Sequence, residues 1–233
     1  LFRSWIREGI TGAMNQAFMK HYKIKKQKKF KLEGRSLIAS DVLKKFIEKI
    51  LDYDMKYAPF KIVGLEASTK EGYAMEFPVE VAGAEQKIRL RGIIDRIDMK
   101  EGKVRVIDYK TGRDEKDFTT IASLVDRKEK SRRKAAFQVF FYSYLFYKKY
   151  PGEYEVIEPG LFNSRDLFSD DFEWQIFDKQ HKTSVTEFRQ YLPDFENALS
   201  AVLTEMYNPA VDFDQTDDLK KCGYCPYKDI CGR

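Results

Sequence analysis

Apolar residues recur at helical spacing near the start of the chain. The spacing predicts one amphipathic helix over residues 2–22 and a second over residues 36–57, with Pro59 marking the end of the second. We expect both apolar stripes to be core faces. The stripe of the second helix consists of Leu37, Ile38, Val42, Leu43, Phe46, Ile47, Ile50 and Leu51.

Two further helices are predicted later in the chain. Residues 135–150 have helical spacing and an unusual weight of aromatic side chains, and Pro151 and Gly152 stop the pattern. Most of those rings must belong to the core. The helical pattern over residues 185–207 contains Pro193, which predicts a kink or a division into two shorter helices.

Between the helices the apolar period shortens to two, which is typical of strands. We expect the first four predicted strands to form one antiparallel-rich sheet. Residues 112–133 are mostly polar and are predicted to form a loop with at most one short helix. The predicted strands cover residues 60–66, 73–81, 86–99, 103–110, 154–162 and 172–177.

The most informative charges lie on the two strands joined by residues 100–102. Gly102 supplies a turn between two β-branched runs, which predicts a hairpin. Alternate strand residues share a face, so Asp108 and Lys110 sit side by side. On the partner strand Asp95 has apolar neighbours, so a cation should compensate it. The sharpest candidate is Mg²⁺ held between Asp95 and Asp108, because hard cations take a few carboxylate oxygens and keep several waters.

A plainer interpretation exists for each of these charges taken singly, because charged residues at strand ends are usually solvated or form surface ion pairs. Two carboxylates and a lysine at the ends of adjacent strands, each after an apolar run, are harder to explain in this way. The same alternation assigns Arg96, Asp98, Arg105 and Tyr109 to the opposite face.

Composition excludes a chain that is disordered throughout. The chain has 233 residues, 43% of them hydrophobic and 15% aromatic, which is enough for a sizeable core. The formal net charge is +5, and basic residues gather at 20–31 and 128–134. Such clusters favour polyanions through counterion release, although a solvated lysine loop explains the first cluster equally well.

The cysteines and the chain termini indicate where in the cell the protein is located. All three cysteines lie in the last dozen residues, which argues against a disulfide framework and for an intracellular, cytoplasmic protein. The chain begins with Leu1 and carries no signal-peptide pattern, so we expect it to be a fragment of a longer protein. No stretch approaches the roughly 18 apolar residues of a membrane span, so a soluble protein without a membrane partner is expected.

Four motifs occur in a set order: Gly92-x-x-Asp95-Arg96-Ile97-Asp98, Ile107-Asp108-Tyr109-Lys110-Thr111-Gly112, Gln138-x-x-x-Tyr142, and a C-terminal Cys-x2-Cys-x5-Cys. Together they resemble the RecB-like branch of the PD-(D/E)XK nucleases, and most of all the AddB-type nuclease domains of bacterial double-strand-break repair. The resemblance covers Glu66 to the end of the chain. It implies an α/β (α+β), restriction-endonuclease-like fold, in which helices flank a mixed central sheet with core order αβββαβ.

The resemblance also implies an organisation into three parts. Residues 1–58 would be N-terminal helices that lead into the core. Residues 59–211 would form the nuclease core with its C-terminal helix, and residues 212–233 would form a cysteine-bearing tail.

Residue roles follow from the same resemblance. It makes Asp95 and Asp108 the ligands of Mg²⁺ (or Mn²⁺) and Lys110 the residue that positions or activates the attacking water. Glu66 fits an additional upstream carboxylate. Gln138 and Tyr142, one turn apart on one helix face, match a motif beside the active site, although a plain hydrogen-bonded pair is the commoner meaning of that spacing. The chemistry of phosphodiester hydrolysis agrees with these roles, because a carboxylate-bound metal supplies a nucleophile from water and stabilises the negative charge that builds on the phosphate.

Two departures from the family pattern concern ligands. Family members carry an upstream histidine as a further metal ligand, but His21 lies in a lysine cluster, so we do not assign it and expect the histidine before Leu1. Cys222, Cys225 and Cys231 have the spacing of a [4Fe-4S] motif without a fourth cysteine. A structural zinc with another fourth ligand is the alternative. We expect no cluster in this fragment, with the tail disordered or packed as a small knuckle.

The leading hypothesis is a magnesium-dependent deoxyribonuclease domain, an exonuclease rather than an endonuclease, that works with a helicase subunit or domain in DNA repair. Alternatives are a non-catalytic DNA-binding module of the same fold, a Cas-type RecB-like exonuclease, and a metal-stabilised interaction domain. The sequence has no Gly-x4-Gly-Lys-Ser/Thr loop, so we assign any ATP hydrolysis to another segment or chain.

Overall fold

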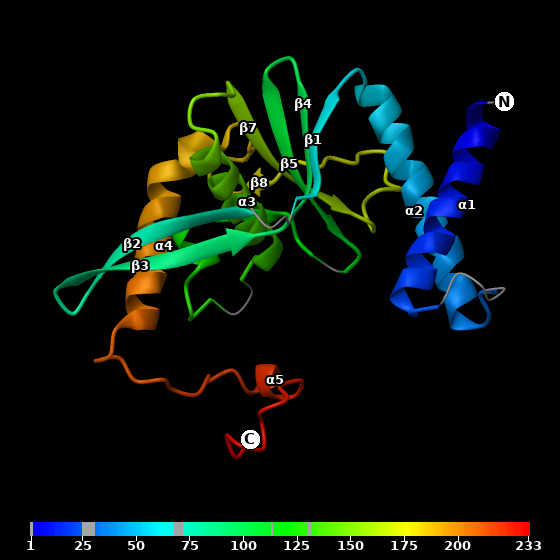
Figure 1. Cartoon of the computed structure of the whole chain (residues 1–233). Coiled ribbons are helices and arrows are strands. Elements are labelled where there is room, and N and C mark those ends of the chain that lie inside the picture. The colour runs from blue at the N-terminus through cyan, green and yellow to red at the C-terminus, as the bar shows by residue number, and fades with distance from the viewer. Residues whose placement is uncertain (1, 25–30, 68–71, 113, 130–131) are drawn as a thin grey trace. The chain divides into compact units, whose positions relative to one another are not determined.

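The computed structural model describes residues 2–24, 31–67, 72–112, 114–129 and 132–233 (Figure 1). The chain divides into two compact units, Leu1–Phe60 with Asn163–Glu173, and Lys61–Phe162 with Trp174–Arg233. Most of the first basic cluster, residues 25–30, and Lys130 of the second lie outside the described residues.

The first unit contains the two predicted N-terminal helices, α1 (Phe2–His21) and α2 (Arg35–Tyr57). Ile10 and Met14 of α1 are buried. The expectation that the α2 stripe is a core face is wrong, because none of the described α2 side chains is fully buried and Ile38 is 67% exposed. Other exposed or half-exposed members of the stripe are Leu37, Val42 and Leu43.

Within its unit, α2 packs against α1 and against the short segment 163–173. Phe168 and Phe172 belong to the short segment 163–173, and their rings lie 5.8 Å from Phe46 and 4.6 Å from Tyr53, centroid to centroid. These contacts involve the second half of the helix. The exposed apolar residues lie mainly in its first half.

The second unit is built on a four-stranded sheet of order β1-β4-β5-β7. The strands are β1 (Lys61–Ala67), β4 (Ile94–Lys100), β5 (Lys103–Lys110) and β7 (Val156–Asn163). β4 is antiparallel to β1 and β5, and the predicted β4–β5 hairpin is confirmed. Its two-residue turn has φ values of 52° at Glu101 and 76° at Gly102, the left-handed pair that suits the twist of flanking strands.

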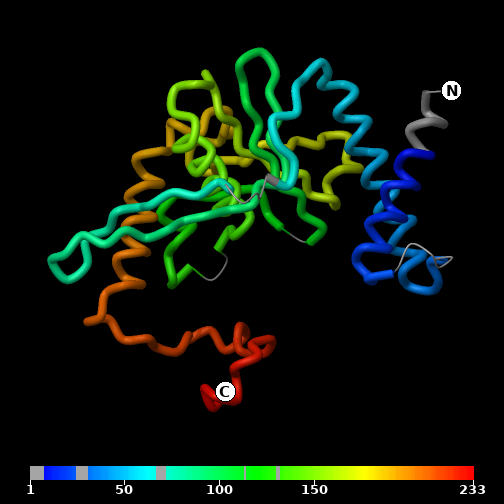
Figure 2. The backbone as a smooth tube through the Cα atoms, in the orientation of Figure 1, coloured from blue at the N-terminus to red at the C-terminus, as the bar shows by residue number. Residues whose placement is uncertain are grey.

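The strands β2 (Tyr73–Val81) and β3 (Ala84–Gly92) form a separate two-stranded ribbon (Figures 1 and 2). The prediction of one sheet containing the first four strands is therefore wrong, and the strand predicted over 86–99 divides at Ile93. Burial explains the division. Along β2, buried or half-buried side chains alternate with exposed ones, and the strand packs on helices α3 and α4. The interiors of β4 and β5 are instead buried on both faces.

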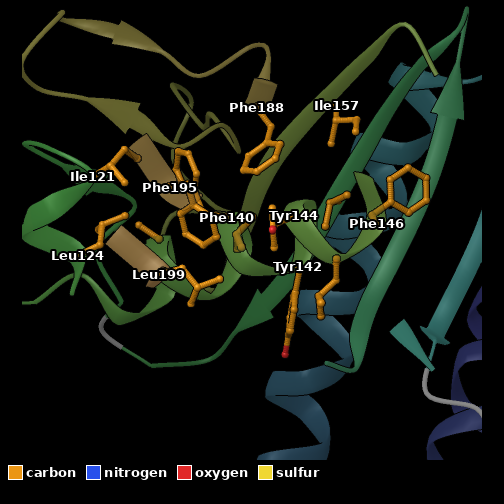
Figure 3. Close-up of a cluster of buried hydrophobic side chains, with 14 of the residues drawn as sticks. Ile121, Leu124, Phe140, Tyr142, Tyr144, Phe146, Ile157, Phe188, Phe195 and Leu199 are labelled. Carbon is orange, nitrogen blue, oxygen red and sulfur yellow. The ribbon is translucent and has the colours of Figure 1, made fainter. Parts of the chain in front are cut away.

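The helices of this unit are α3 (Lys134–Lys149) and α4 (Leu192–Tyr207). Phe140 of α3 packs among Phe188 and Phe195, at 5.8 and 6.0 Å between ring centroids (Figure 3). The predicted aromatic core of α3 is thus confirmed. Pro193 lies in the first turn of α4, and a short 3₁₀ helix, η2 (Phe188–Tyr191), precedes it, so the division into two helices is correct.

Small elements complete the unit. The strand predicted over residues 172–177 is largely absent from the described structure, where Gln175 makes an isolated bridge to Gly160 and β8 covers only Phe177–Asp178. β8 pairs with β6 (Asp117–Phe118) and β9 (Thr183–Ser184), and the predicted 112–133 loop also holds the 3₁₀ helix η1 (Ala122–Leu124).

After α4 the chain runs without regular structure to a single helical turn, α5 (Leu219–Cys222) (Figure 2). Along the chain, the elements follow the predicted αβββαβ order, namely α2, then β1, β4 and β5 with the β2–β3 ribbon inserted, then α3 and β7. Within the described part of the chain, every helix is too short or too polar to cross a membrane.

Candidate active site

Asp95 and Asp108 face each other where the β4–β5 ladder ends. The register pairs Ile97 with Val106 and Arg96 with Ile107, so its next step places Asp95 opposite Asp108 on the face of Ile97 and Val106. At that point the backbone N–H of Tyr109 donates to Oδ2 of Asp95 at 2.9 Å. This bond holds the Asp95 carboxylate at the strand end. Asp108 itself is 1% exposed, so its carboxylate is set into the protein.

Lys110 connects this pair to helix α3. Its Nζ lies 2.6 Å from Oδ2 of Asp108 and donates at 2.8 Å to Oε1 of Gln138. Nε2 of Gln138 in turn donates to the Tyr142 hydroxyl at 2.7 Å. The structure thus brings five of the predicted site residues together, Asp95, Asp108, Lys110, Gln138 and Tyr142. Their functional roles stay predictions.

Burial dominates the electrostatics of Asp108. It raises the pKa of this carboxyl from its ordinary value of 3.8 to about 6, with smaller contributions from the negative charges of Asp95 and Asp114, while Lys110 pulls the pKa down. Sequence reasoning missed Asp114, which follows the Lys110–Gly112 motif. The Oδ2 atom of Asp114 lies only 2.9 Å from where a Cβ on Gly112 would be, so the glycine permits this approach.

Tyr142 combines a buried ring with a polar end. Its ring belongs to the hydrophobic cluster of α3, and its hydroxyl points away from the other labelled side chains of that cluster (Figure 3). Burial is the largest cause of a raised Tyr142 pKa, and Asp108 and Asp95 add to it, so the hydroxyl keeps its proton at neutral pH.

Gly92 of the first motif is required by the ring of Tyr142. A Cβ at this position would lie 2.9 Å from Cε1 of Tyr142 and 3.0 Å from Cδ1 of Leu145. Contacts this short do not occur with real side chains. The glycine therefore permits the close approach of β3 to the Tyr142 ring of helix α3.

Glu66 is less closely integrated. It lies between the pairs Leu65–Arg96 and Ala67–Ile94, which places it opposite Asp95, but its φ is 45° and its side chain is exposed. Across the described ranges, no three or more His, Cys, Asp or Glu side chains are grouped to hold a metal ion. The donor chemistry nevertheless fits a hard divalent cation, because carboxylate oxygens are its preferred ligands and the negative charges of Asp95 and Asp114 both act on the buried Asp108 carboxyl.

The cysteine motif does not form a comparable set. Cys222, Cys225 and Cys231 are free thiols, and the described residues near them include no grouped fourth ligand. Backbone bonds from Cys225 N–H to the Cys222 carbonyl, 3.1 Å, and from Cys231 N–H to the Tyr227 carbonyl, 3.3 Å, fold the tail locally. As arranged here, the thiols do not fit an iron-sulfur cluster or a structural zinc site, and we derive no role for either.

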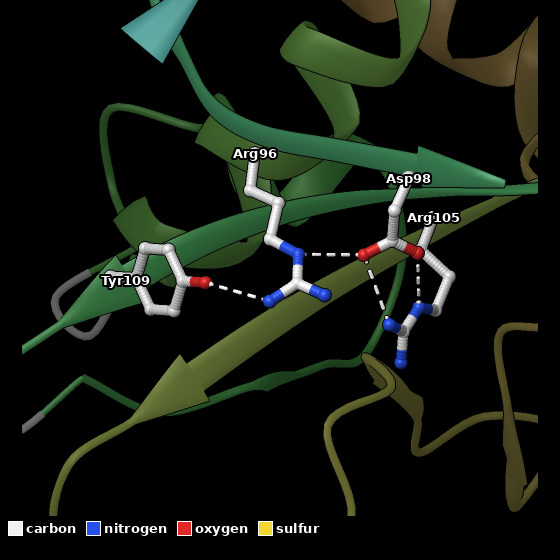
Figure 4. A network of polar contacts seen from close by, with 4 residues as sticks. All are labelled: Arg96, Asp98, Arg105 and Tyr109. Atoms are coloured by element: carbon white, nitrogen blue, oxygen red, sulfur yellow. Dashed lines mark hydrogen bonds and ion pairs between the residues drawn. The ribbon is translucent and has the colours of Figure 1, made fainter. Parts of the chain in front are cut away.

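The opposite face of the hairpin holds a buried charge network (Figure 4). Arg105 donates to both oxygens of Asp98, at 2.7 and 2.9 Å, and Arg96 donates to the same carboxylate at 2.7 Å and to the Tyr109 hydroxyl at 3.2 Å. The predicted face is confirmed, but sequence reasoning missed the burial, since Asp98 is 0% exposed. The hairpin register could have predicted the ion pair, because it sets Asp98 directly opposite Arg105.

A family model described as the PD-(D/E)XK nuclease superfamily matches residues 8–232. The chain belongs to this superfamily. The predicted mixed α+β, restriction-endonuclease-like fold, with a central sheet between helices, is thereby confirmed. The matched range includes the two carboxylates and the lysine of the β4–β5 hairpin.

Two further comparisons add little to this assignment. No curated protein matches the sequence significantly. Among solved structures, the one described as "Crystal structure of SSO0001" is similar at 19% sequence identity, with 85% of this chain and 71% of that chain covered and a TM-score of 0.35.

Proposed function

We propose that this PD-(D/E)XK chain is a metal-dependent deoxyribonuclease domain that hydrolyses DNA phosphodiester bonds. The observation that supports this most directly is the Lys110 ammonium 2.6 Å from the buried Asp108 carboxylate, with Asp95 opposite on the next strand. In a nuclease superfamily, this set provides both a place for a cation and a fixed positive charge beside it.

Asp95 and Asp108 would hold Mg²⁺ or Mn²⁺, with Glu66 as a further carboxylate near Asp95. When bound, such an ion supplies positive charge to the phosphate and lowers the pKa of a water. The carboxylates meet the requirement for oxygen ligands.

Lys110 and Tyr142 act on the substrate directly, and Gln138 positions them. The Lys110 ammonium can donate to a phosphate oxygen or to the attacking water, and its bond to Gln138 fixes its position. Tyr142 keeps its proton at neutral pH and can donate it in a hydrogen bond to a second phosphate oxygen. The chain thus offers donors from both a strand and a helix to one phosphate group.

We further propose that the domain is an exonuclease of the AddB/RecB-like type that serves a helicase subunit or domain in double-strand-break repair. The order of the Gly92, Asp108, Gln138 and Cys222 motifs supports this assignment. The lysines and arginines at 128–134 are suited to a polyanionic partner.

The proposal is tested by cleavage of end-labelled single-stranded and duplex DNA in Mg²⁺ or Mn²⁺. We expect Asp108→Asn and Lys110→Met each to reduce the rate by about 100-fold or more, the usual cost of losing one charge-stabilising group. Asp217→Asn, in the exposed tail, and Lys103→Met, at the far end of β5, are matched controls that should leave the rate unchanged.

Two outcomes would overturn the assignment. Cleavage that is unaffected by Asp108→Asn and Lys110→Met places the chemistry elsewhere. Salt-dependent DNA binding with no turnover in either metal identifies a non-catalytic DNA-binding module instead.

A further inference from the structure

A pocket of about 380 Å³ adjoins the candidate active site. One wall comes from the end of β3 and the link that follows it, with Arg91, Gly92 and Ile93. The other comes from α3, where Phe137 and Phe141 lie beside Gln138 and Tyr142. Because Gln138 and Tyr142 belong to the hydrogen-bond chain that starts at Lys110, a group in this pocket lies next to the proposed site of the phosphate.

Two aromatic rings give the pocket a preformed shape. The rings of Phe137 and Phe141 are stacked, with centroids 6.1 Å apart and planes 11° from parallel. Phe137 also packs on the buried Phe195 at 5.9 Å, which anchors it to α4. Both phenylalanines remain partly exposed on a helix whose other rings are mainly buried. Partly exposed rings that are held in place suit stacking with a planar ligand.

The polar groups of the pocket are cationic or neutral. Arg91 is exposed and has no carboxylate partner among the residues that the structure describes. The lining residues include no acid, in contrast to Asp95, Asp108 and Asp114 nearby. A second pocket of about 400 Å³ shares Phe137 and Phe141 and adds two cations, Arg132 and Lys134. An anionic ligand with planar, uncharged parts fits both the charge and the rings.

We propose that the pocket beside Tyr142 receives one unpaired nucleobase of the DNA strand whose phosphate lies at the Asp108–Lys110 site. Phe137 and Phe141 provide the stacking surface, and Arg91 pairs with a neighbouring phosphate. A base within a duplex has both faces covered by its neighbours, so the pocket selects single-stranded or locally opened DNA. This inference rests on the proposed nuclease function and adds to it a determinant of substrate form.

The test measures binding without cleavage, in the metal-free protein with EDTA present. The probes are a single-stranded oligonucleotide, the same strand with 2-aminopurine at successive positions, and the same strand with an abasic site at those positions. We expect fluorescence quenching of 2-aminopurine at one or two adjacent positions. An abasic site there should weaken binding by about tenfold, the effect of losing one stacked base.

Variants tie the effect to the pocket. In Phe141→Ala, and in Phe141→Leu, which keeps apolar volume without a ring, the abasic penalty should fall to less than about twofold and the quenching should disappear. Phe141→Tyr should retain both. Phe213→Ala removes a ring that is 98% exposed in the tail, and Arg89→Ala removes an exposed arginine of β3 that does not line the pocket, so both should behave as wild type.

Failure of this inference is distinguishable from failure of the proposed function. Binding of the intact strand with no abasic penalty at any position, or a penalty that survives in both Phe141→Ala and Phe141→Leu, overturns the pocket assignment while Asp108-dependent cleavage still stands. Absence of any binding to single-stranded DNA also overturns it. The cleavage assay with Asp108→Asn and Lys110→Met judges the nuclease function separately.

Discussion

Lys110 and Asp108 lie two positions apart on β5 and form an ion pair of 2.6 Å between Nζ and Oδ2. Despite this ion pair, the pKa of Asp108 is raised to about 6, because burial and the neighbouring carboxylates outweigh the attraction of Lys110. The pair is therefore not a balanced salt bridge. It is a carboxylate in an unfavourable setting that one lysine partly relieves, as expected of a site shaped for an additional cation.

Removal of the lysine should raise the Asp108 pKa further. In metal-free Lys110→Met we expect the Asp108 carboxyl to titrate above about 6, because Lys110 is the largest influence that lowers its pKa. Carboxyl-carbon NMR against pH measures this directly. Lys103→Met, at the opposite end of the same strand, is the control. An Asp108 titration that is the same in wild type and Lys110→Met would show that the ion pair does not form in solution.

The raised pKa also predicts how stability depends on pH. The folded protein holds the Asp108 proton more tightly than the unfolded chain does, so its free energy of unfolding falls as pH rises from about 4 to about 6. Asp108→Asn removes this contribution. At pH 7 the metal-free variant should be more stable than wild type by about 3 kcal/mol, and at pH 4 the difference should be less than about 1 kcal/mol. Urea unfolding at the two pH values tests this, and equal differences at both would contradict it.

Gly92→Ala should impair the site while the fold persists. The added Cβ would lie 2.9 Å from the Tyr142 ring, so the ring or β3 must shift, which costs about 1–3 kcal/mol of stability. A displaced Tyr142 loses its bond to Gln138, so we expect cleavage to fall by about tenfold or more. The control is Gly12→Ala in α1, where an added Cβ meets nothing within 4 Å. Full activity of Gly92→Ala would mean that the position of Tyr142 is unimportant.

The network opposite the candidate site should matter for folding. Asp98→Ala removes the carboxylate that both Arg96 and Arg105 use, and breaking such a buried pair typically costs about 3–5 kcal/mol. Denaturant unfolding measures the loss. Lys87→Ala breaks an exposed pair with Glu76, 3.7 Å apart, and should cost less than about 1 kcal/mol. A similar small cost for Asp98→Ala would show that the network adds nothing to stability.

The sequence predicted those features that local rules determine. The turn at Glu101 and Gly102 fixes the register of β4 against β5, and the register alone then places Asp95 opposite Asp108. Helical spacing likewise sets Gln138 one turn before Tyr142. The order of the motifs predicted the superfamily, and the family model that matches residues 8–232 confirms it.

The features that the sequence did not predict depend on what lies across from a residue. Alternation along Tyr73–Val81 shows that one face is buried, but not that helices rather than the central sheet cover it. Arg96, Asp98 and Arg105 have the alternation of a solvated face, although they are buried. Asp114 reaches Asp108 through the fold of a loop, which no periodicity describes.

The amide of Gln138 gives the hydrogen-bond chain a direction. Its oxygen is occupied by Lys110 and its nitrogen by the Tyr142 hydroxyl oxygen, so the hydroxyl proton of Tyr142 is left to point outward. A glutamate of the same length would accept at both ends and draw that proton inward. The direction in which Tyr142 offers its proton to a phosphate is therefore determined by a neutral side chain on a helix, and not by the charges on the hairpin.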